Sequence, residues 1–126
     1  MSKKISVSYK QQVGRWGEQV AELYLKEHGL ELLARNVRTH YGEIDLVMKQ
    51  GQELVFVEVK ARTNDTYGMP ESALTENKRA HLLAAIEAYL LTLDQPESQW
   101  RVDVVSVRGK PGEVNVEITW FENALA

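Results

Sequence analysis

Two apolar runs on either side of a glycine constrain the fold of this chain more than any other feature. Residues 43–49 and 53–61 are rich in Ile, Leu, Val and Phe, and Gln50-Gly51-Gln52 lies between them. Short apolar runs joined around a glycine are typical of two antiparallel strands connected by a tight turn. We therefore predict a β-hairpin over this part of the chain.

Charged side chains interrupt both runs of the predicted hairpin. Because side chains alternate across a strand, the pattern predicts one apolar and one charged face. The predicted apolar face holds Ile44, Leu46, Met48, Val55, Val57, Val59 and Ala61, and the opposite face holds Glu43, Asp45, Val47, Phe56, Glu58, Lys60 and Arg62. A loop of three or four residues would place Asp45 and Glu58 across from each other, within one register step.

The rest of the chain predicts an α/β protein. Helices are expected at 11–28, where Gly29 suits the C-terminal cap, and at 75–93; strands are expected at 100–107 and 114–121, around Lys110-Pro111-Gly112. Residues 30–38 contain a short apolar stretch that can supply a strand leading into a loop, whereas 62–70 and 94–99 are expected to be loops and 1–10 to be loosely ordered. This order favours a mixed sheet flanked by helices, in a single domain over 1–126.

Composition excludes several classes of protein. The chain is 44% hydrophobic and 26% charged, and it contains no apolar run long enough to cross a membrane. The basic start at Lys3-Lys4 has no apolar segment after it, so we expect no secretory signal, no membrane partner and a cytoplasmic location. With no cysteine, disulfides and thiolate zinc sites are excluded. The net charge of −3 argues against bulk attraction to nucleic acid, so any such partner needs a local basic surface.

Two carboxylates facing each other across a hairpin call for a physical explanation. One interpretation is a solvated strand face, which antiparallel sheets often have. However, opposed carboxylates repel each other, and a cation between them would remove that cost. With a backbone carbonyl, Asp45 and Glu58 would make a hard-oxygen site suited to Mg²⁺ or Mn²⁺. Lys60 would project to the same face, where it could orient a water molecule or stabilise charge on a phosphate.

A third carboxylate is expected from the first helix. At 100° per residue, Glu18 falls at the far edge of the apolar arc formed by Trp16, Val20 and Leu23, where it can reach a cleft beside the sheet or face solvent. Gly14 and Gly17 lie on the same arc and would let this helix approach its neighbour closely.

Several segments together resemble a known family. These segments are GRWGEQVAELYL, ARNVRTHYGEIDLVM, VFVEVKART, PESALTENKRAHL and WRVDVVSV, which span roughly residues 11–108. They are similar to the YraN-like family of uncharacterised bacterial proteins, which resembles a branch of the PD-(D/E)XK nuclease superfamily near the archaeal Holliday junction resolvases. The resemblance implies a restriction-endonuclease-like core in the order αβββαβ.

The resemblance also implies roles for individual residues. Asp45 matches the aspartate of the superfamily motif, Glu58-Val59-Lys60 matches the (D/E)XK element, and Glu18 matches the acid carried by a helix in many members. Asp45, Glu58 and the Val59 carbonyl would hold Mg²⁺ or Mn²⁺ with help from Glu18, and Lys60 would position the attacking water. The chain departs from the motif at Ile44, where the superfamily pattern has proline.

The implied activity is metal-dependent endonucleolytic hydrolysis of phosphodiester bonds in nucleic acid, DNA rather than RNA, with branched or junction DNA as a candidate substrate. The basic residues near the motifs are candidate substrate contacts: Arg15, Arg35, Arg38, His40, Lys49, Arg62, Lys78 and Arg79. For Lys78 the favoured explanation is an exposed helix lysine, and a phosphate contact is the alternative. Tyr41 and Tyr67 flank the site segment and are candidates for base stacking or for covering the edge of the core.

Cutting a junction symmetrically needs two sites, which predicts a homodimer. Two other classes remain open. One is a non-catalytic nucleic-acid-binding module that retains the nuclease fold, and the other is a protein-interaction domain whose charged face is merely solvated. His28, His40 and His81 lack the spacing of a metal site, and the chain has neither a phosphate-binding G-x-x-x-x-G-K-[ST] loop nor a recognisable Ser or Cys nucleophile motif.

Overall fold

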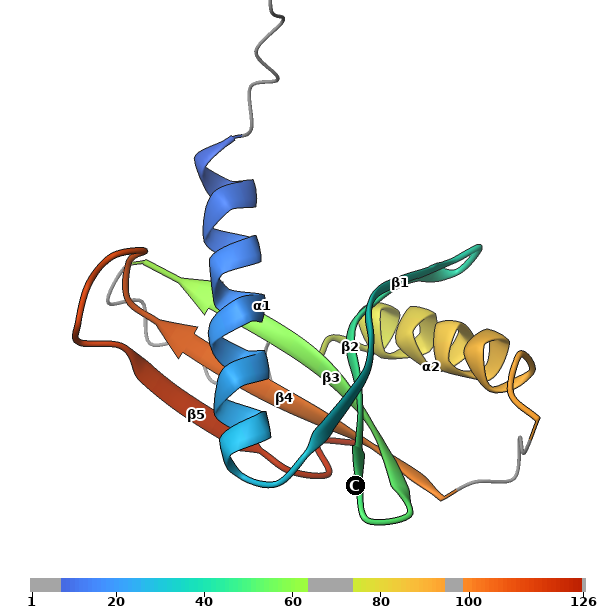
Figure 1. The fold of residues 1–126 in the computed structure, drawn as a ribbon. Helices are drawn as coiled ribbons and strands as arrows, with labels where there is room; N and C mark the ends of the chain where they lie inside the picture. The colour runs from blue at the N-terminus through green and yellow to red at the C-terminus, as the bar shows by residue number, and fades with distance from the viewer. Residues whose placement is uncertain (1–7, 64–73, 95–98, 126) are drawn as a thin grey trace, which may run out of the picture.

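The computed structural model describes residues 8–63, 74–94 and 99–125, which form one five-stranded sheet and two helices. Along the chain these are α1 (Tyr9–Glu27), β1 (Glu31–Thr39), β2 (Gly42–Gln50), β3 (Glu53–Arg62), α2 (Glu76–Leu90), β4 (Trp100–Arg108) and β5 (Glu117–Phe121) (Figure 1). The sheet order is β1-β2-β3-β4-β5, and every neighbouring pair is antiparallel except β3 and β4. The predicted α/β class with a mixed sheet and helices on its faces is therefore confirmed.

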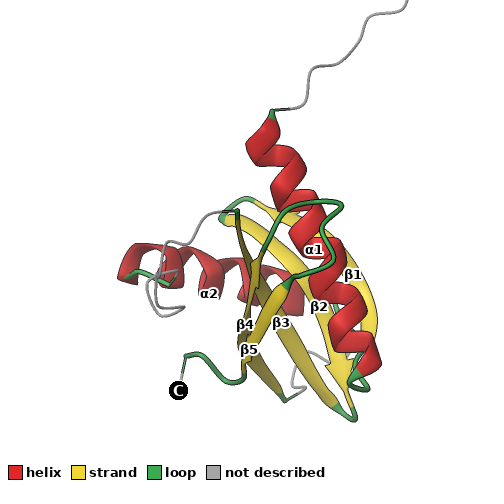
Figure 2. Ribbon diagram, turned by 90° about the vertical axis from the view of Figure 1, so that its left-hand side faces the viewer, coloured by secondary structure: helices red, strands yellow, loops and turns green. Residues whose placement is uncertain are grey.

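The two helices cover opposite faces of the sheet (Figure 2). On the α1 side, Leu25 packs with Leu46, Val57 and Val105 in one buried cluster. On the α2 side, a second buried cluster contains Ile86, Val47, Phe56 and Val102 among others. A parallel β3–β4 pair requires a crossover connection, and α2 lies in that connection.

The predicted apolar face of the hairpin is confirmed at Leu46, Met48, Val55 and Val57, which pack in the α1 cluster, but the prediction that the opposite face is charged is wrong for part of its length. Val47 and Phe56 were assigned to the charged face, yet both are fully buried beneath α2. Ile44 was assigned to the same face as Leu46, but it packs in the α2 cluster whereas Leu46 packs in the α1 cluster. The physical reason is that both sheet faces are covered by helices, so the strands need apolar residues on both sides.

The first helix begins earlier than the sequence pattern predicts. A capping box precedes it: the Ser8 hydroxyl accepts a hydrogen bond from the Gln11 N–H at 3.1 Å, and Gln11 Oε1 accepts one from the Ser8 N–H at 3.2 Å. The prediction of loose order is thus wrong for residues 8–10, and residues 1–7 lie outside the described part of the chain.

Other boundaries differ by a few residues. Thr75 caps α2, which ends at Leu90 instead of Leu93. The stretch 30–38, which the sequence left between strand and loop, corresponds to β1 at Glu31–Thr39. The last strand, β5, begins at Glu117 instead of 114. Most of the predicted loops at 62–70 and 94–99 fall outside the described residues.

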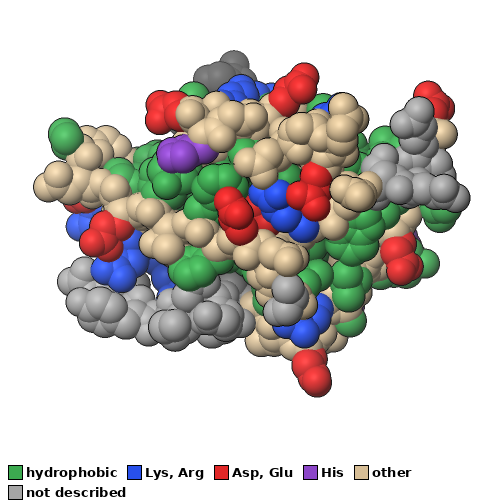
Figure 3. All heavy atoms as spheres, turned by 90° about the horizontal axis from the view of Figure 1, so that it is seen from below, with side chains coloured by type: hydrophobic (Ala, Val, Ile, Leu, Met, Phe, Trp, Pro, Cys, Tyr) green, Lys and Arg blue, Asp and Glu red, His purple; other side chains and the backbone are tan. Residues whose placement is uncertain are grey.

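A glycine sets the distance between α1 and the sheet. A Cβ atom built on Gly17 would lie 2.5 Å from the Cβ of Ala61 in β3, closer than real Cβ contacts allow. Only glycine permits this approach, which brings the next residue, Glu18, near the carboxyl groups of Asp45 and Glu58 on β2 and β3. Among the described residues, no helix is long and apolar enough to span a bilayer. Seen from below, acidic and basic side chains are interspersed on the surface, with hydrophobic side chains between them (Figure 3).

Candidate active site

The site forms where two neighbouring strands part. The pairing of β2 with β3 runs from Gln50–Glu53 to Leu46–Val57, while β2 stays paired with β1 as far as Gly42. One step beyond Leu46–Val57, the register places Asp45 across from Glu58, as predicted. The Asp45 carboxylate reaches β3 there, where its Oδ2 accepts a hydrogen bond from the Val59 N–H at 2.8 Å.

Asp45 and Glu58 are half-buried, and the pKa of each carboxyl is raised. Burial raises the pKa of Asp45 to about 6, against the lowering effect of the Val59 N–H, and a hydrogen bond with Glu58 also lowers it. Burial and then the charge of Asp45 raise the pKa of Glu58 to about 8. Both carboxyls are therefore harder to ionise than free ones, because burial and nearby negative charge disfavour the ionised forms. Such burial argues against a simply solvated strand face at these two positions.

Glu18 brings a third carboxylate to the site from α1. Its pKa is raised to about 7 by burial, then by the charges of Asp45 and Glu43. Asn36 of β1 opposes this rise: with its amide nitrogen turned toward the acids, that nitrogen lies 2.8 Å from Glu18 Oε1 and 2.9 Å from Glu43 Oε1. The helix thus presents Glu18 toward the carboxylates of the strands, which is one of the two placements that the apolar arc left open.

Two lysines stand beside the carboxyl pair. Burial, and then the charges of Lys78 and Arg62, lower the pKa of Lys60, while Glu58 raises it. Lys78 and Lys60 in turn lower the pKa of Glu58 by their charges. Lys78 also lines a cavity of about 200 Å³ with Glu43 and Glu58. The structure therefore brings Lys78 to the site, although nothing in its helical position distinguished it from an exposed lysine.

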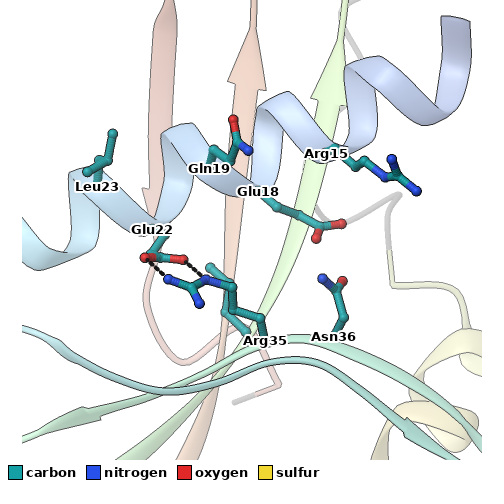
Figure 4. Close-up of a pocket in the computed structure, with 8 residues that line it drawn as sticks. Arg15, Glu18, Gln19, Glu22, Leu23, Arg35 and Asn36 are labelled. Carbon is teal, nitrogen blue, oxygen red and sulfur yellow. Dashed lines mark hydrogen bonds and ion pairs between the residues drawn. The ribbon is translucent and has the colours of Figure 1, made fainter.

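A larger groove of about 510 Å³ opens between α1 and β1, next to Glu18 (Figure 4). Arg15 lies at one end, and its charge lowers the pKa of Glu18. Also lining the groove, exposed Arg35 donates from Nε and Nη2 to the two oxygens of Glu22 at 2.5 and 2.9 Å. Together with the Lys26–Glu22 ion pair at 2.8 Å, this holds the pKa of Glu22 at about 2.

The other residues predicted to contact the substrate have fewer interactions with the carboxylates of the site. The guanidinium of Arg35 is engaged by Glu22, and exposed Arg38 lies 3.7 Å from Glu43. Arg62 acts on Lys60 through its charge, and Arg79 is exposed on α2. Of the others, His40 and Tyr41 are exposed beyond the end of β1, Lys49 is half-buried on β2, and Tyr67 lies outside the described residues. All of them stay predictions.

The donor chemistry of the site suits a hard divalent cation. Its groups are oxygen donors, and the pKa values of the carboxyls are raised because burial and mutual repulsion disfavour their ionised forms, a cost that a cation would remove. Within residues 8–63, 74–94 and 99–125, no three Asp, Glu or His side chains are already grouped to hold a metal ion by themselves. Mg²⁺ commonly uses only one or two carboxylates and completes its shell with water and phosphate oxygens, so Asp45 and Glu58 fit it.

Sequence reasoning missed two residues at this site as functional groups. Asn36 lies in the middle of β1 with φ of +48°, and Glu43 shares its amide. An asparagine inside a strand pattern was the only available signal, because asparagine is depleted in strands and tolerates positive φ.

Fold and site together define an α/β protein in which a half-buried group of carboxylates lies beside lysines at the point where two strands separate. The family described as "Uncharacterised protein family UPF0102" matches residues 17–107. A UPF0102 protein of Desulfosudis oleivorans is 40% identical over 120 residues, covering 95% of this chain and 98% of the relative. One from Legionella pneumophila is 39% identical over 116 residues (91% and 95%), and one from Nocardia farcinica is 42% identical over 106 residues (84% of each chain).

This chain belongs to the UPF0102 family. The predicted YraN-like membership is thereby confirmed.

Proposed function

We propose that this protein is a divalent-metal-dependent nuclease with a restriction-endonuclease-like core. The observation that carries the proposal is the meeting of Asp45, Glu58 and Glu18, from two strands and a helix, beside Lys60. Support also comes from the element order α1, β1–β3, α2, β4, which agrees with the order αβββαβ of the nuclease superfamily that the sequence resembles.

Each group has a role that follows from its surroundings. Asp45, Glu58 and the Val59 carbonyl would hold Mg²⁺ or Mn²⁺, with Glu18 contributing from α1. The ion would supply Lewis acidity and neutralise negative charge on the scissile phosphate. Lys60, whose pKa is lowered by burial, orients the water whose oxygen attacks phosphorus as the ester P–O bond breaks.

The substrate class follows from the basic groups around the carboxylates. Lys78 stands on the α2 side and Arg15 on the α1 side, so a phosphate chain crossing the site meets a cation on each side. These local cations oppose the net charge of −3. We propose DNA, with branched or junction DNA first among candidates, cleaved by a homodimer.

The test is cleavage of labelled four-way-junction, flap, single-stranded and linear duplex DNA with Mg²⁺, Mn²⁺ or EDTA. Lys60→Ala and Asp45→Asn are each expected to lower the cleavage rate by about 100-fold or more. Lys110→Ala and Glu117→Gln, exposed changes away from the site, are the matched controls and should cut like the wild type.

The other outcomes separate the classes that remained open. Salt-sensitive binding to one DNA structure without cleavage would support the non-catalytic binding module. Neither binding nor cleavage, by protein shown to be folded, would refute the nuclease proposal. Loss of cleavage in the control variants as well would show that the assay reports folding instead of the site.

A further inference from the structure

Asn36 has a backbone conformation that its place in a strand does not explain. It lies inside β1 with φ of +48°, in the left-handed region that side chains rarely adopt. The pairs Arg35–Leu46 and Val37–Ile44 flank it, so the register sets Asn36 across from Asp45. The strained residue is therefore the β1 neighbour of a proposed metal ligand.

The side chain of Asn36 uses this conformation to reach two acids. From β1 it points toward Glu18 on α1 (Figure 4). With its amide nitrogen turned toward the acids, so that the nitrogen and not the oxygen meets their acceptors, this nitrogen lies 2.8 Å from Glu18 Oε1 and 2.9 Å from Glu43 Oε1. Glycine would adopt the same φ at lower cost but would bring no donor. Asparagine is one of the few side chains that tolerate this φ, and at this position it also brings an amide donor to the acids.

We propose that Asn36 is a positioning residue, whose amide holds the Glu18 carboxylate toward Asp45 and keeps it apart from Glu43. A neutral donor between two carboxylates binds both without adding charge. Without it, repulsion from Asp45 and Glu43 and attraction to Arg15 would turn Glu18 toward the open groove. The consequence for metal binding and cleavage rests on the proposed function, whereas the contact itself does not.

The contact is tested by NMR on metal-free protein. Glu18→Ala removes one acceptor, so the side-chain amide signals of Asn36 should shift. Asn123 is the internal control, because it is also an exposed asparagine with positive φ (+53°) but lies far from Glu18 in the sheet order, after β5. Asn36 signals that do not move, or that move no more than those of Asn123, would overturn the proposal.

The consequence is tested with Asn36→Gly, which keeps the backbone conformation and removes the amide, and with Asn123→Gly as the matched control. Asn36→Gly should weaken Mn²⁺ binding, measured by calorimetry, by about 10-fold or more, as loss of groups that orient metal ligands does. Its cleavage should recover as Mn²⁺ is raised, and its urea midpoint should not fall. Asn123→Gly should bind Mn²⁺ like the wild type.

The outcomes are separable. Unchanged Mn²⁺ affinity in Asn36→Gly, with a wild type that binds, would overturn the positioning role. If the wild type neither binds Mn²⁺ nor cleaves, the proposed function fails. In that case, a shift of the Glu18 carboxyl ¹³C signal in Asn36→Gly would still support positioning, and an unmoved signal would overturn it.

Discussion

Two glycines in α1 allow the free-energy effect of its close packing against β3 to be measured. A Cβ atom at Gly17 would lie 2.5 Å from the Cβ of Ala61, whereas a Cβ atom at Gly14 would have no neighbour within 4 Å. Both glycines lie within the same helix. Replacing each with alanine is therefore the same chemical change in two different surroundings, one crowded and one open.

The expected effects can be worked out from these distances. In a helix interior, alanine is more favourable than glycine by about 1 kcal/mol, so Gly14→Ala should raise the free energy of unfolding by that amount. At Gly17 the same gain is opposed by overpacking against β3, which costs about 1–3 kcal/mol. Gly17→Ala should therefore lower the free energy of unfolding by about 0–2 kcal/mol, and the two variants should differ by about 1–3 kcal/mol.

Urea unfolding at constant pH measures both values, and thermal unfolding should separate the variants by about 3–5 °C per kcal/mol in a chain of this size. Ala61→Gly removes the opposing Cβ, so the double variant with Gly17→Ala should show less destabilisation than the two single changes predict together. Under the proposed function, cleavage should fall in Gly17→Ala but not in Gly14→Ala, because only the former change is expected to displace Glu18. Equal stabilisation by both alanines would refute the reasoning that contact with Ala61 sets the position of α1.

Two further predictions concern the free energy of unfolding: its pH dependence, which follows from Glu18 and Glu58, and its loss when Asp103 is replaced. Glu18 and Glu58 have folded-state pKa values of about 7 and about 8, above their ordinary 4.5, so their contribution to stability is complete below about pH 4.5 and is lost as the pH rises through these values. Urea midpoints should therefore fall from pH 5 to pH 8 in metal-free protein, and Glu58→Gln should flatten the fall; a parallel profile in this variant would contradict the assignment. Asp103→Ala should lower the free energy of unfolding by about 3–5 kcal/mol because it leaves the charge of largely buried Arg101 without this partner, whereas Glu117→Ala in an exposed pair should cost under about 1 kcal/mol. Similar losses in both urea titrations would refute the distinction.

The hairpin was predictable because its signal is local. Alternating apolar residues and the turn at Gly51, with φ of +60°, fixed β2 and β3 to within one residue at each end. The pairing of Asp45 with Glu58 followed from that turn. By contrast, β1 was ambiguous, because it is an edge strand with no fully buried residue and an irregular register between Leu32 and Ala34.

Contacts between elements that lie far apart in the chain could not be predicted from the sequence. The burial of Phe56 depends on how α2 docks, and the pairing of Arg35 with Glu22 joins β1 to α1, which no local pattern encodes. Asn36 shows the same limit: an asparagine in a strand signals an irregularity, but only the assembled sheet and helix show which carboxylates it meets.

Asp103 and Asp45, one fully buried and one half-buried, differ in which groups stabilise their negative charge. Asp103 is fully buried and accepts hydrogen bonds from Arg101, from the Trp120 indole and from the Asn123 N–H, so the protein itself stabilises the ionised form. Asp45 accepts from one backbone N–H and faces other acids. A carboxylate that serves folding alone is expected to resemble Asp103, because unmatched buried charge lowers stability. The charges of Lys60 and Lys78 only partly stabilise the ionised carboxyls around Asp45, whose pKa values stay raised. Under the proposed function, a divalent cation bound with a phosphate chain would supply the remaining positive charge.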